Sequence, residues 1–179
     1  MSKFVTKNIE AVKGKQQFRQ LIVVADTVDV VKLQSEINSL EERNRLIEEK
    51  NLIEPAESKV EVMKGVLDLY EDSLETKYVG SFKGILIHME LVANLQNVSP
   101  KKFKDITPHK EKVKEFEFKY GDLRVYAIDL PNGKLIMHCG YKNKQEKDIR
   151  KFRSQKEQYL KSLEQIKLKE NEKGRIAKK

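Results

Sequence analysis

One stretch of the chain, from Tyr120 to Gln145, carries cations within a pattern that otherwise predicts a β-hairpin. Arg124 lies inside the first strand of this hairpin, and Lys142 and Lys144 follow the second. A guanidinium is a planar donor that can bind a phosphate through two parallel hydrogen bonds, and a strand holds it rigidly. These residue types and their spacing therefore predict a phosphate-sized binding spot at one end of a small sheet.

The strands that would position these cations are predicted over residues 114–140. In the segment "KEFEFKY", charged and aromatic residues alternate with the period of two of a half-buried antiparallel strand. Gly121-Asp122 and Asn132-Gly133 suit the two turns that follow, since these residue types favour tight turns. The predicted fold class is α+β, with a small antiparallel meander packed by an N-terminal helical hairpin and a C-terminal helix.

The N-terminal half predicts one strand and then helices. "FRQLIVVAD", residues 18–26, is a β-branched run typical of a buried strand. A seam with alternating steps of three and four follows, and Pro55 ends it. A second helix is expected from about Ala56, giving an antiparallel hairpin over residues 28–75, and residues 85–95 favour a further helix. The seam residues are Val30, Leu33, Ile37, Leu40, Asn44 and Ile47.

The C-terminal end carries the whole net charge of +8. Residues 1–141 hold equal numbers of basic and acidic side chains, whereas residues 142–179 hold 14 basic and 6 acidic ones. Such a basic end suits a polyanionic partner, and a solvated lysine-rich helix that only keeps the protein in solution fits the charge equally well. We expect a single domain over residues 1–170 and a basic flexible tail over 171–179.

Cysteine content and hydropathy indicate the compartment. Cys139 is the one cysteine, so an intrachain disulfide and a cysteine-based zinc site are both excluded. The first residues lack the apolar segment of a signal peptide, and no apolar run approaches the roughly 20 residues of a spanning helix. The expected location is the cytoplasm, with no membrane partner.

The succession from Val113 to Phe152 resembles the RelE/HigB-type toxins of bacterial toxin–antitoxin systems, in the RelE/ParE superfamily. The matching elements are Glu115-Phe116 in an acidic-hydrophobic strand, the run 123–126 with an arginine and an aromatic residue, and the Gly-aromatic-Lys-x-Lys element 140–144. The resemblance covers roughly residues 100–155. The predicted strand and helical hairpin upstream also fit the family, with longer helices than is typical.

The resemblance implies cleavage of messenger RNA on the ribosome without a metal or other cofactor. The 2′-hydroxyl attacks the adjacent phosphate, so the reaction needs a base, cations for the charged transition state and an acid for the leaving oxygen. Arg124 would bind phosphate, Lys142 and Lys144 would stabilise the transition state, and His138 would serve in proton transfer. Glu115 and Glu117 stand where the best-studied ribosome-dependent relatives carry lysines, so either carboxylate would replace lysine as the base or cleavage is lost.

RNA contacts are expected around this set. Each assignment has a structural alternative: Arg124 could pair with Glu115 or Glu117 across the sheet, and the lysines could belong to a solvated turn. Tyr126 could simply pack in the sheet, and a lone strand histidine such as His138 is more often structural. The expected RNA-binding residues are Lys119, Tyr126, Tyr141, Lys147 and Arg150.

The implied partners are a cognate antitoxin protein, messenger RNA and the ribosome. Superfamily members that target DNA gyrase keep the fold without this catalytic set, so fold alone does not decide the activity. The alternative function is a non-catalytic protein of RelE-like fold that binds a protein partner or nucleic acid. In that case the seam of the helical hairpin would mediate self-association or capture another helix.

Overall fold

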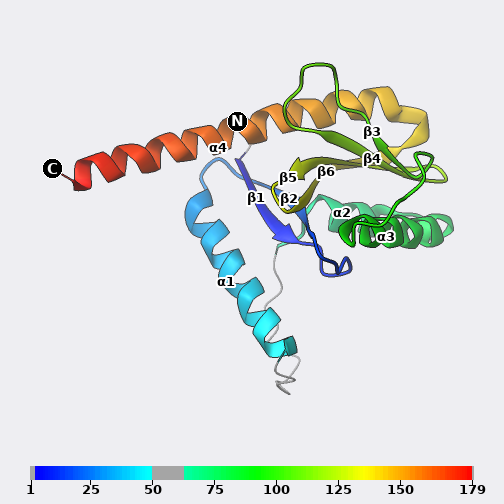
Figure 1. Ribbon diagram of the computed structural model, residues 1–179, viewed down its shortest axis with the longest axis horizontal. Coiled ribbons are helices and arrows are strands. Elements are labelled where there is room, and N and C mark those ends of the chain that lie inside the picture. The colour runs from blue at the N-terminus through cyan, green and yellow to red at the C-terminus, as the bar shows by residue number, and fades with distance from the viewer. Residues whose placement is uncertain (1–2, 50–62, 179) are drawn as a thin grey trace.

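The computed structural model describes residues 3–49 and 63–178, and its centre is a six-stranded sheet (Figure 1). The strands lie in the order β1-β2-β6-β5-β4-β3. All neighbouring pairs are antiparallel except β2 and β6, which are parallel. The strands are β1 Lys3–Asn8, β2 Gln17–Val24, β3 Phe103–Asp105, β4 Glu115–Tyr120, β5 Leu123–Leu130 and β6 Gly133–Tyr141.

The α+β class is confirmed, but the prediction of a simple antiparallel meander is wrong, because the sheet is larger and mixed. The meander is present as β4, β5 and β6, and the strand predicted over residues 18–26 joins its edge as β2. The N–H of Gln17 donates to Asn132 O at 2.8 Å where β2 meets the β5–β6 turn. A Cβ on Gly133 would collide with the backbone of Gln17, so only glycine allows this approach.

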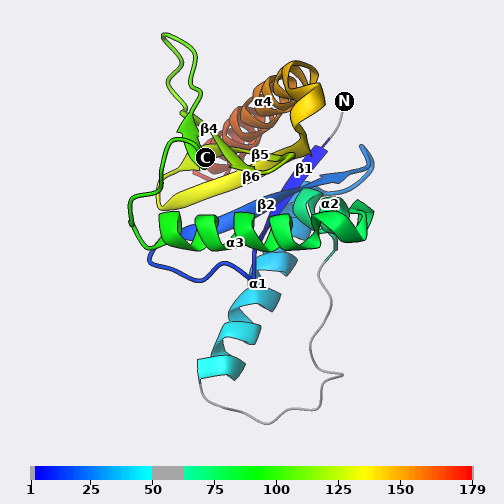
Figure 2. The ribbon, with the colours of Figure 1, turned by 90° about the vertical axis from the view of Figure 1, so that its right-hand side faces the viewer.

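One face of the sheet is covered by α2 (Val66–Ser73) and α3 (Val79–Ala93), joined by a 3₁₀ turn over Thr76–Tyr78 (Figure 2). The helix favoured for residues 85–95 is confirmed as part of α3. Gln20 on β2 is buried and accepts the N–H groups of Leu67 and Asp68 through Oε1, which satisfies the start of α2. The core of this layer is apolar and includes Phe18, Phe82, Ile85, Met89, Phe118, Val125 and Ile136.

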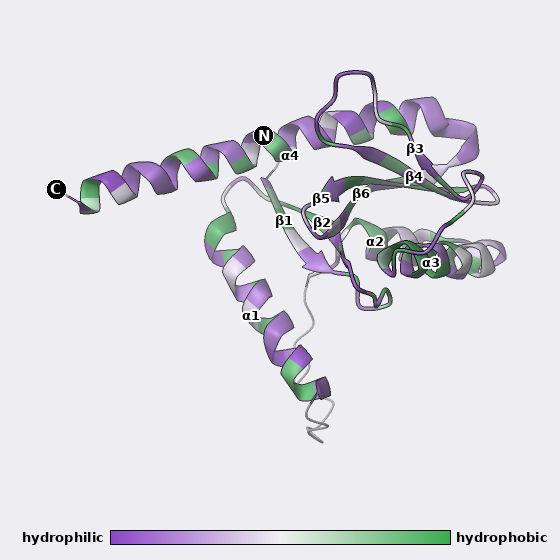
Figure 3. Cartoon of the chain, in the orientation of Figure 1, coloured by the Kyte–Doolittle hydropathy of each residue, from purple (hydrophilic) through white to green (hydrophobic). Residues whose placement is uncertain are grey.

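The opposite face is covered by the first half of α4 (Gln145–Ala177), which follows a 3₁₀ turn over Lys142–Lys144. Its stripe packs Phe152 and Tyr159 against side chains of β1, β2, β5 and β6. The helix then runs on past the sheet, and its second half is mostly hydrophilic (Figure 3). The helix continues to Ala177, whereas the sequence predicts a flexible tail from residue 171. The sheet partners of this stripe are Phe4, Leu21, Tyr126, Ile128, Leu135 and Met137.

The predicted helical hairpin is not what the described residues form. α1 (Val30–Glu49) follows Asp29, whose Oδ1 accepts the N–H of Lys32, and the helix runs along β1 at the edge of the sheet. Its seam residue Ile37 packs against Val5, Ile22 and Val24, whereas α2 packs on β2 and β6. The apolar seam of α1 therefore packs against strands and not against a second helix. The start of a second helix near Ala56 lies outside the described residues.

Candidate functional site

Arg124 on β5 faces the first turns of α4. It pairs in register with Lys119 on β4 and Gly140 on β6, and its side chain is 7% exposed. Nη1 donates to Gly121 O at 2.7 Å and to Leu123 O at 2.8 Å. Among the described residues, its Nε has no hydrogen-bond partner and no carboxylate forms an ion pair with it. Within the described residues, Arg124 therefore forms no cross-strand ion pair with Glu115 or Glu117.

Tyr126 lies two residues along the same strand and the same face. Its ring is fully buried between Phe152 of α4, at 5.6 Å between centroids, and His138 of β6, at 6.2 Å. Its hydroxyl makes no well-formed hydrogen bond within the part of the chain that the structure describes, although the Glu117 carboxylate lies close enough to interact with it. Burial raises the pKa of Tyr126, and the charges of Glu117 and Asp148 raise it further. Two polar groups on this face thus keep unused hydrogen-bonding capacity.

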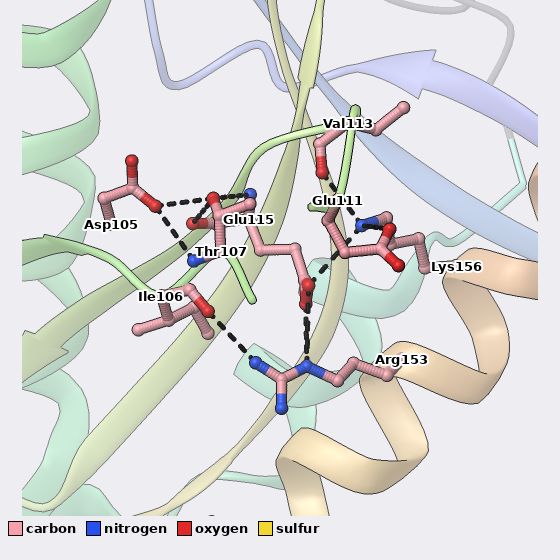
Figure 4. A network of polar contacts seen from close by, with 8 residues as sticks. All are labelled: Asp105, Ile106, Thr107, Glu111, Val113, Glu115, Arg153 and Lys156. Carbon is pink, nitrogen blue, oxygen red and sulfur yellow. Dashed lines mark hydrogen bonds and ion pairs between the residues drawn. The ribbon is translucent and has the colours of Figure 1, made fainter. Parts of the chain in front are cut away.

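Glu115 on β4 belongs to a network that fastens α4 to the sheet (Figure 4). Its carboxylate is 1% exposed and lies 2.8 Å from Arg153 Nε and 3.4 Å from Lys156 Nζ, both on α4. Lys156 also donates to Val113 O and pairs with Glu111. Glu115 neither faces a free cleft nor neutralises Arg124, because its charge is taken up by α4.

Glu117 and His138 also contact side chains of α4. Glu117 accepts a hydrogen bond from Gln145 Nε2 at 2.7 Å, and Lys119 Nζ lies 3.9 Å from it. His138 Nε2 lies 3.1 Å from Asp148 Oδ1 on α4. A Cβ on Gly140 would collide with the Asp148 carboxylate, so this glycine makes room for the contact. The face that the sequence predicts as catalytic is therefore covered by α4.

The predicted lysines gather at the same end of the sheet as Arg124. Lys119 on β4 lies opposite Arg124 in the strand register. The N–H of Lys142 donates to Asp122 O at 2.8 Å, next to Gly121, whose carbonyl accepts a hydrogen bond from the Arg124 guanidinium. The side chains of Lys142 and Lys144 are exposed. Lys147 and Arg150 are exposed on α4, and no ion pair forms to them from the described residues.

Tyr141 does not belong to this set. It pairs in register with Leu123, and its ring packs on the opposite face of the sheet against Tyr70 and Tyr78, at 5.9 and 5.5 Å between centroids. The step of one residue from Gly140 reverses the face, since side chains alternate along a strand. Tyr141 therefore lies on the opposite face of the sheet from Arg124 and Tyr126.

Sequence reasoning missed the α4 residues that close this face. Four of them contact the sheet carboxylates or His138: Gln145, Asp148, Arg153 and Lys156. A signal was present, because Lys156 falls between Phe152 and Tyr159 on the apolar stripe of the helix. A lysine at such a position is buried, and a buried lysine requires an acidic partner. Glu111 and the buried Glu115 are the acidic partners of Lys156.

Comparisons with protein-family models, with curated proteins and with solved structures found no match for this chain. Within residues 3–49 and 63–178, no helix has both the length and the apolar character needed to span a membrane. The same residues contain no group of three or more His, Cys, Asp or Glu side chains placed to hold a metal ion.

Proposed function

We propose that this protein is the toxin component of a toxin–antitoxin pair, a metal-independent endoribonuclease that acts on messenger RNA in the cytoplasm and is neutralised by a cognate antitoxin. The observation that carries the proposal is the Arg124–Tyr126 pair. A buried guanidinium with an unpartnered Nε and no carboxylate is suited to a phosphate, because an anion supplies the missing acceptor. The order of strand, helices, meander and helix supports the same family.

The proposed activity requires that RNA reach the face of the sheet that α4 covers. Since Glu117, His138 and Tyr126 all contact α4, an RNA strand reaches Arg124 only when the first turns of α4 separate from the sheet. Lys142 and Lys144 then lie at the end where the phosphate enters. Arg124 would stabilise the negative charge on the phosphoryl oxygens. Of Glu117 and His138, released from α4, one would take the proton from the 2′-hydroxyl and the other, in its protonated form, would give a proton to the leaving 5′ oxygen.

Expression of the chain alone in a bacterial host tests this function. The wild type should arrest growth, and Arg124→Ala should relieve the arrest, while Lys83→Ala, which removes an exposed cation from α3 on the other side of the sheet, serves as the control. Purified protein should cleave ribosome-bound messenger RNA, and cleavage should be unchanged when the protein has first been treated with EDTA and dialysed. Growth unaffected by wild-type protein that is soluble and folded would rule the proposal out.

A second candidate function is favoured by the engagement of Glu115, Glu117 and His138. All three side chains are used in contacts within the chain, as in a scaffold that binds a protein partner or nucleic acid without catalysis. On this reading, wild-type expression is harmless and no cleavage occurs. Binding to RNA that weakens steeply with salt and is lost on removing residues 165–179 would then identify the partner as nucleic acid.

A further inference from the structure

β1 is an edge strand, so it pairs with another strand, β2, on one side only. The N–H of Ile9, just past the end of β1, donates to Phe18 O of β2 at 3.0 Å. Because backbone groups alternate between the two sides of a strand, the odd-numbered residues of β1 point theirs toward β2 and the even-numbered ones point theirs away. The backbone groups of Thr6 and Asn8 therefore face the open side of the sheet. Such an edge is where another strand can bind.

Side chains of α1 occupy these open positions. The N–H of Thr6 donates to Gln34 Oε1 at 2.7 Å, and Gln34 Nε2 donates back to Thr6 O at 2.9 Å. The N–H of Asn8 donates to Glu41 Oε2 at 2.9 Å. The Gln34 amide thus makes both of the hydrogen bonds that a residue of a seventh strand would make with Thr6.

Helical spacing places these side chains on the side of α1 that packs on the sheet (Figure 1). Gln34, Ile37 and Glu41 follow one another in steps of three and four, so they share one face of the helix. Ile37 is buried against strands. Glu41 also pairs with Arg19 of β2 at 3.2 Å, and each of these two side chains is only 14% exposed. An apolar contact and an ion pair therefore hold α1 where its polar side chains reach the edge.

The two edges of the sheet are protected differently. β3, at the far edge, spans only three residues, and so short a strand offers few groups for pairing. β1 spans six residues. We propose that α1 is an edge guard, in which Gln34 and Glu41 take the hydrogen bonds of a seventh strand and so prevent the sheet from extending into a second copy of the chain. This role does not depend on the proposed ribonuclease activity.

Amide hydrogen exchange followed by NMR tests the contacts themselves. In the wild type, the N–H groups of Thr6 and Asn8 should be protected, as is that of Lys7, which points toward β2. Gln34→Ala with Glu41→Ala should speed up exchange at Thr6 and Asn8 relative to Lys7 by about tenfold, the factor expected for one hydrogen bond. Glu41→Gln keeps an acceptor and should leave Asn8 protected. Unprotected Thr6 and Asn8 in the wild type would overturn the proposal, whether or not the variants fold.

Sedimentation velocity tests the consequence for association. At about 100 μM, Gln34→Ala with Glu41→Ala should form larger assemblies than the wild type. The matched control is Lys32→Ala with Glu36→Ala, two exposed positions on the same helix, which should keep the wild-type size. Circular dichroism establishes that each variant is folded.

A proline on the edge shows whether such assemblies form through β1. Adding Asn8→Pro to the Gln34→Ala, Glu41→Ala variant should restore the wild-type size, because proline removes an outward N–H that pairing with β2 does not use. Assemblies that persist with Asn8→Pro overturn the proposal. A Gln34→Ala, Glu41→Ala variant that keeps the wild-type size overturns it equally.

Discussion

The two faces of the sheet are covered in different ways. Under α2 and α3 the core is apolar, with Phe18, Phe118 and Met89 at its centre. Under α4 an apolar strip is flanked by buried charged side chains, namely Glu115, Glu117, Arg124, Asp148 and Lys156. Apolar contacts are strong and non-directional, whereas buried ion pairs cost desolvation and fix position. The first face therefore holds the fold together, and the second sets where α4 lies.

The largest loss of stability is expected on the apolar face. Phe118→Ala removes a fully buried ring that packs on Phe18 and Phe103, and should lower the free energy of unfolding by about 4 kcal/mol. Urea unfolding followed by circular dichroism measures the loss. Leu69→Ala, exposed on α2, should change stability by less than about 0.5 kcal/mol. If Phe118→Ala lowered the free energy of unfolding by less than about 1 kcal/mol, the apolar face would not be the main source of stability.

The α4 face should respond with a smaller and more local loss. Glu115→Gln leaves the buried Lys156 without its closest buried acid and should lower the free energy of unfolding by about 3 kcal/mol. Amide hydrogen exchange should speed up first in the beginning of α4 and only later in β5 and β6. Adding Lys156→Met should recover part of the loss, and Glu157→Gln, exposed on the same helix, is the control. Uniform exchange across both faces would contradict the local role.

Gly140→Ala tests the close approach of α4 without changing any charge. The added methyl group collides with the Asp148 carboxylate, so we expect a loss of about 2 kcal/mol and altered contacts of His138. Gly80→Ala in α3 is the matched control, since its Cβ would enter open space and should stabilise the helix by about 0.5 kcal/mol. Thermal unfolding of both variants provides the measurement, and equal effects would show that α4 does not constrain position 140.

The smallest effect concerns pH on the apolar face, where Asp68 stands beside Lys7. Partial burial raises the pKa of this carboxyl, but hydrogen bonds from Lys7, Gly65 N–H and Gln20 outweigh it and hold the pKa below 3.8. Because the folded pKa is depressed, the contribution is fully present above the unfolded pKa and is lost as the pH falls through the folded pKa. The stability difference between wild type and Asp68→Asn should therefore shrink below about pH 4. A difference that stays constant from pH 6 to pH 3 contradicts this.

Local patterns made part of the structure predictable. The alternation through Phe116 and Phe118 predicts β4, and the Asn132-Gly133 turn predicts the β5–β6 hairpin, because both signals depend on neighbouring residues only. β1 and β3 were not predicted. β3 spans three residues, too few for a period to show, and β1 precedes a segment of mixed polarity.

The partners of each element were less predictable than the elements. The seam through Ile37 indicates an apolar stripe but does not specify whether a helix or the strands carrying Val5 and Ile22 will cover it. The same limit applies to the candidate site. The face shared by Arg124 and Tyr126 follows from alternation, whereas its closure by Asp148 and Arg153 depends on where a helix more than twenty residues away folds back.

The parallel pairing of β2 with β6 has a consequence for the order of folding. β2 is complete by Val24, yet its partner begins only at Gly133, so the chain must leave the ribosome as far as Ile136 before β2 and β6 can pair. Contacts between such distant segments form slowly, because the entropy of closing a long loop must be overcome first. Until then the β1–β2 hairpin has an open edge, and during synthesis this edge is where the nascent chain would bind a chaperone or aggregate.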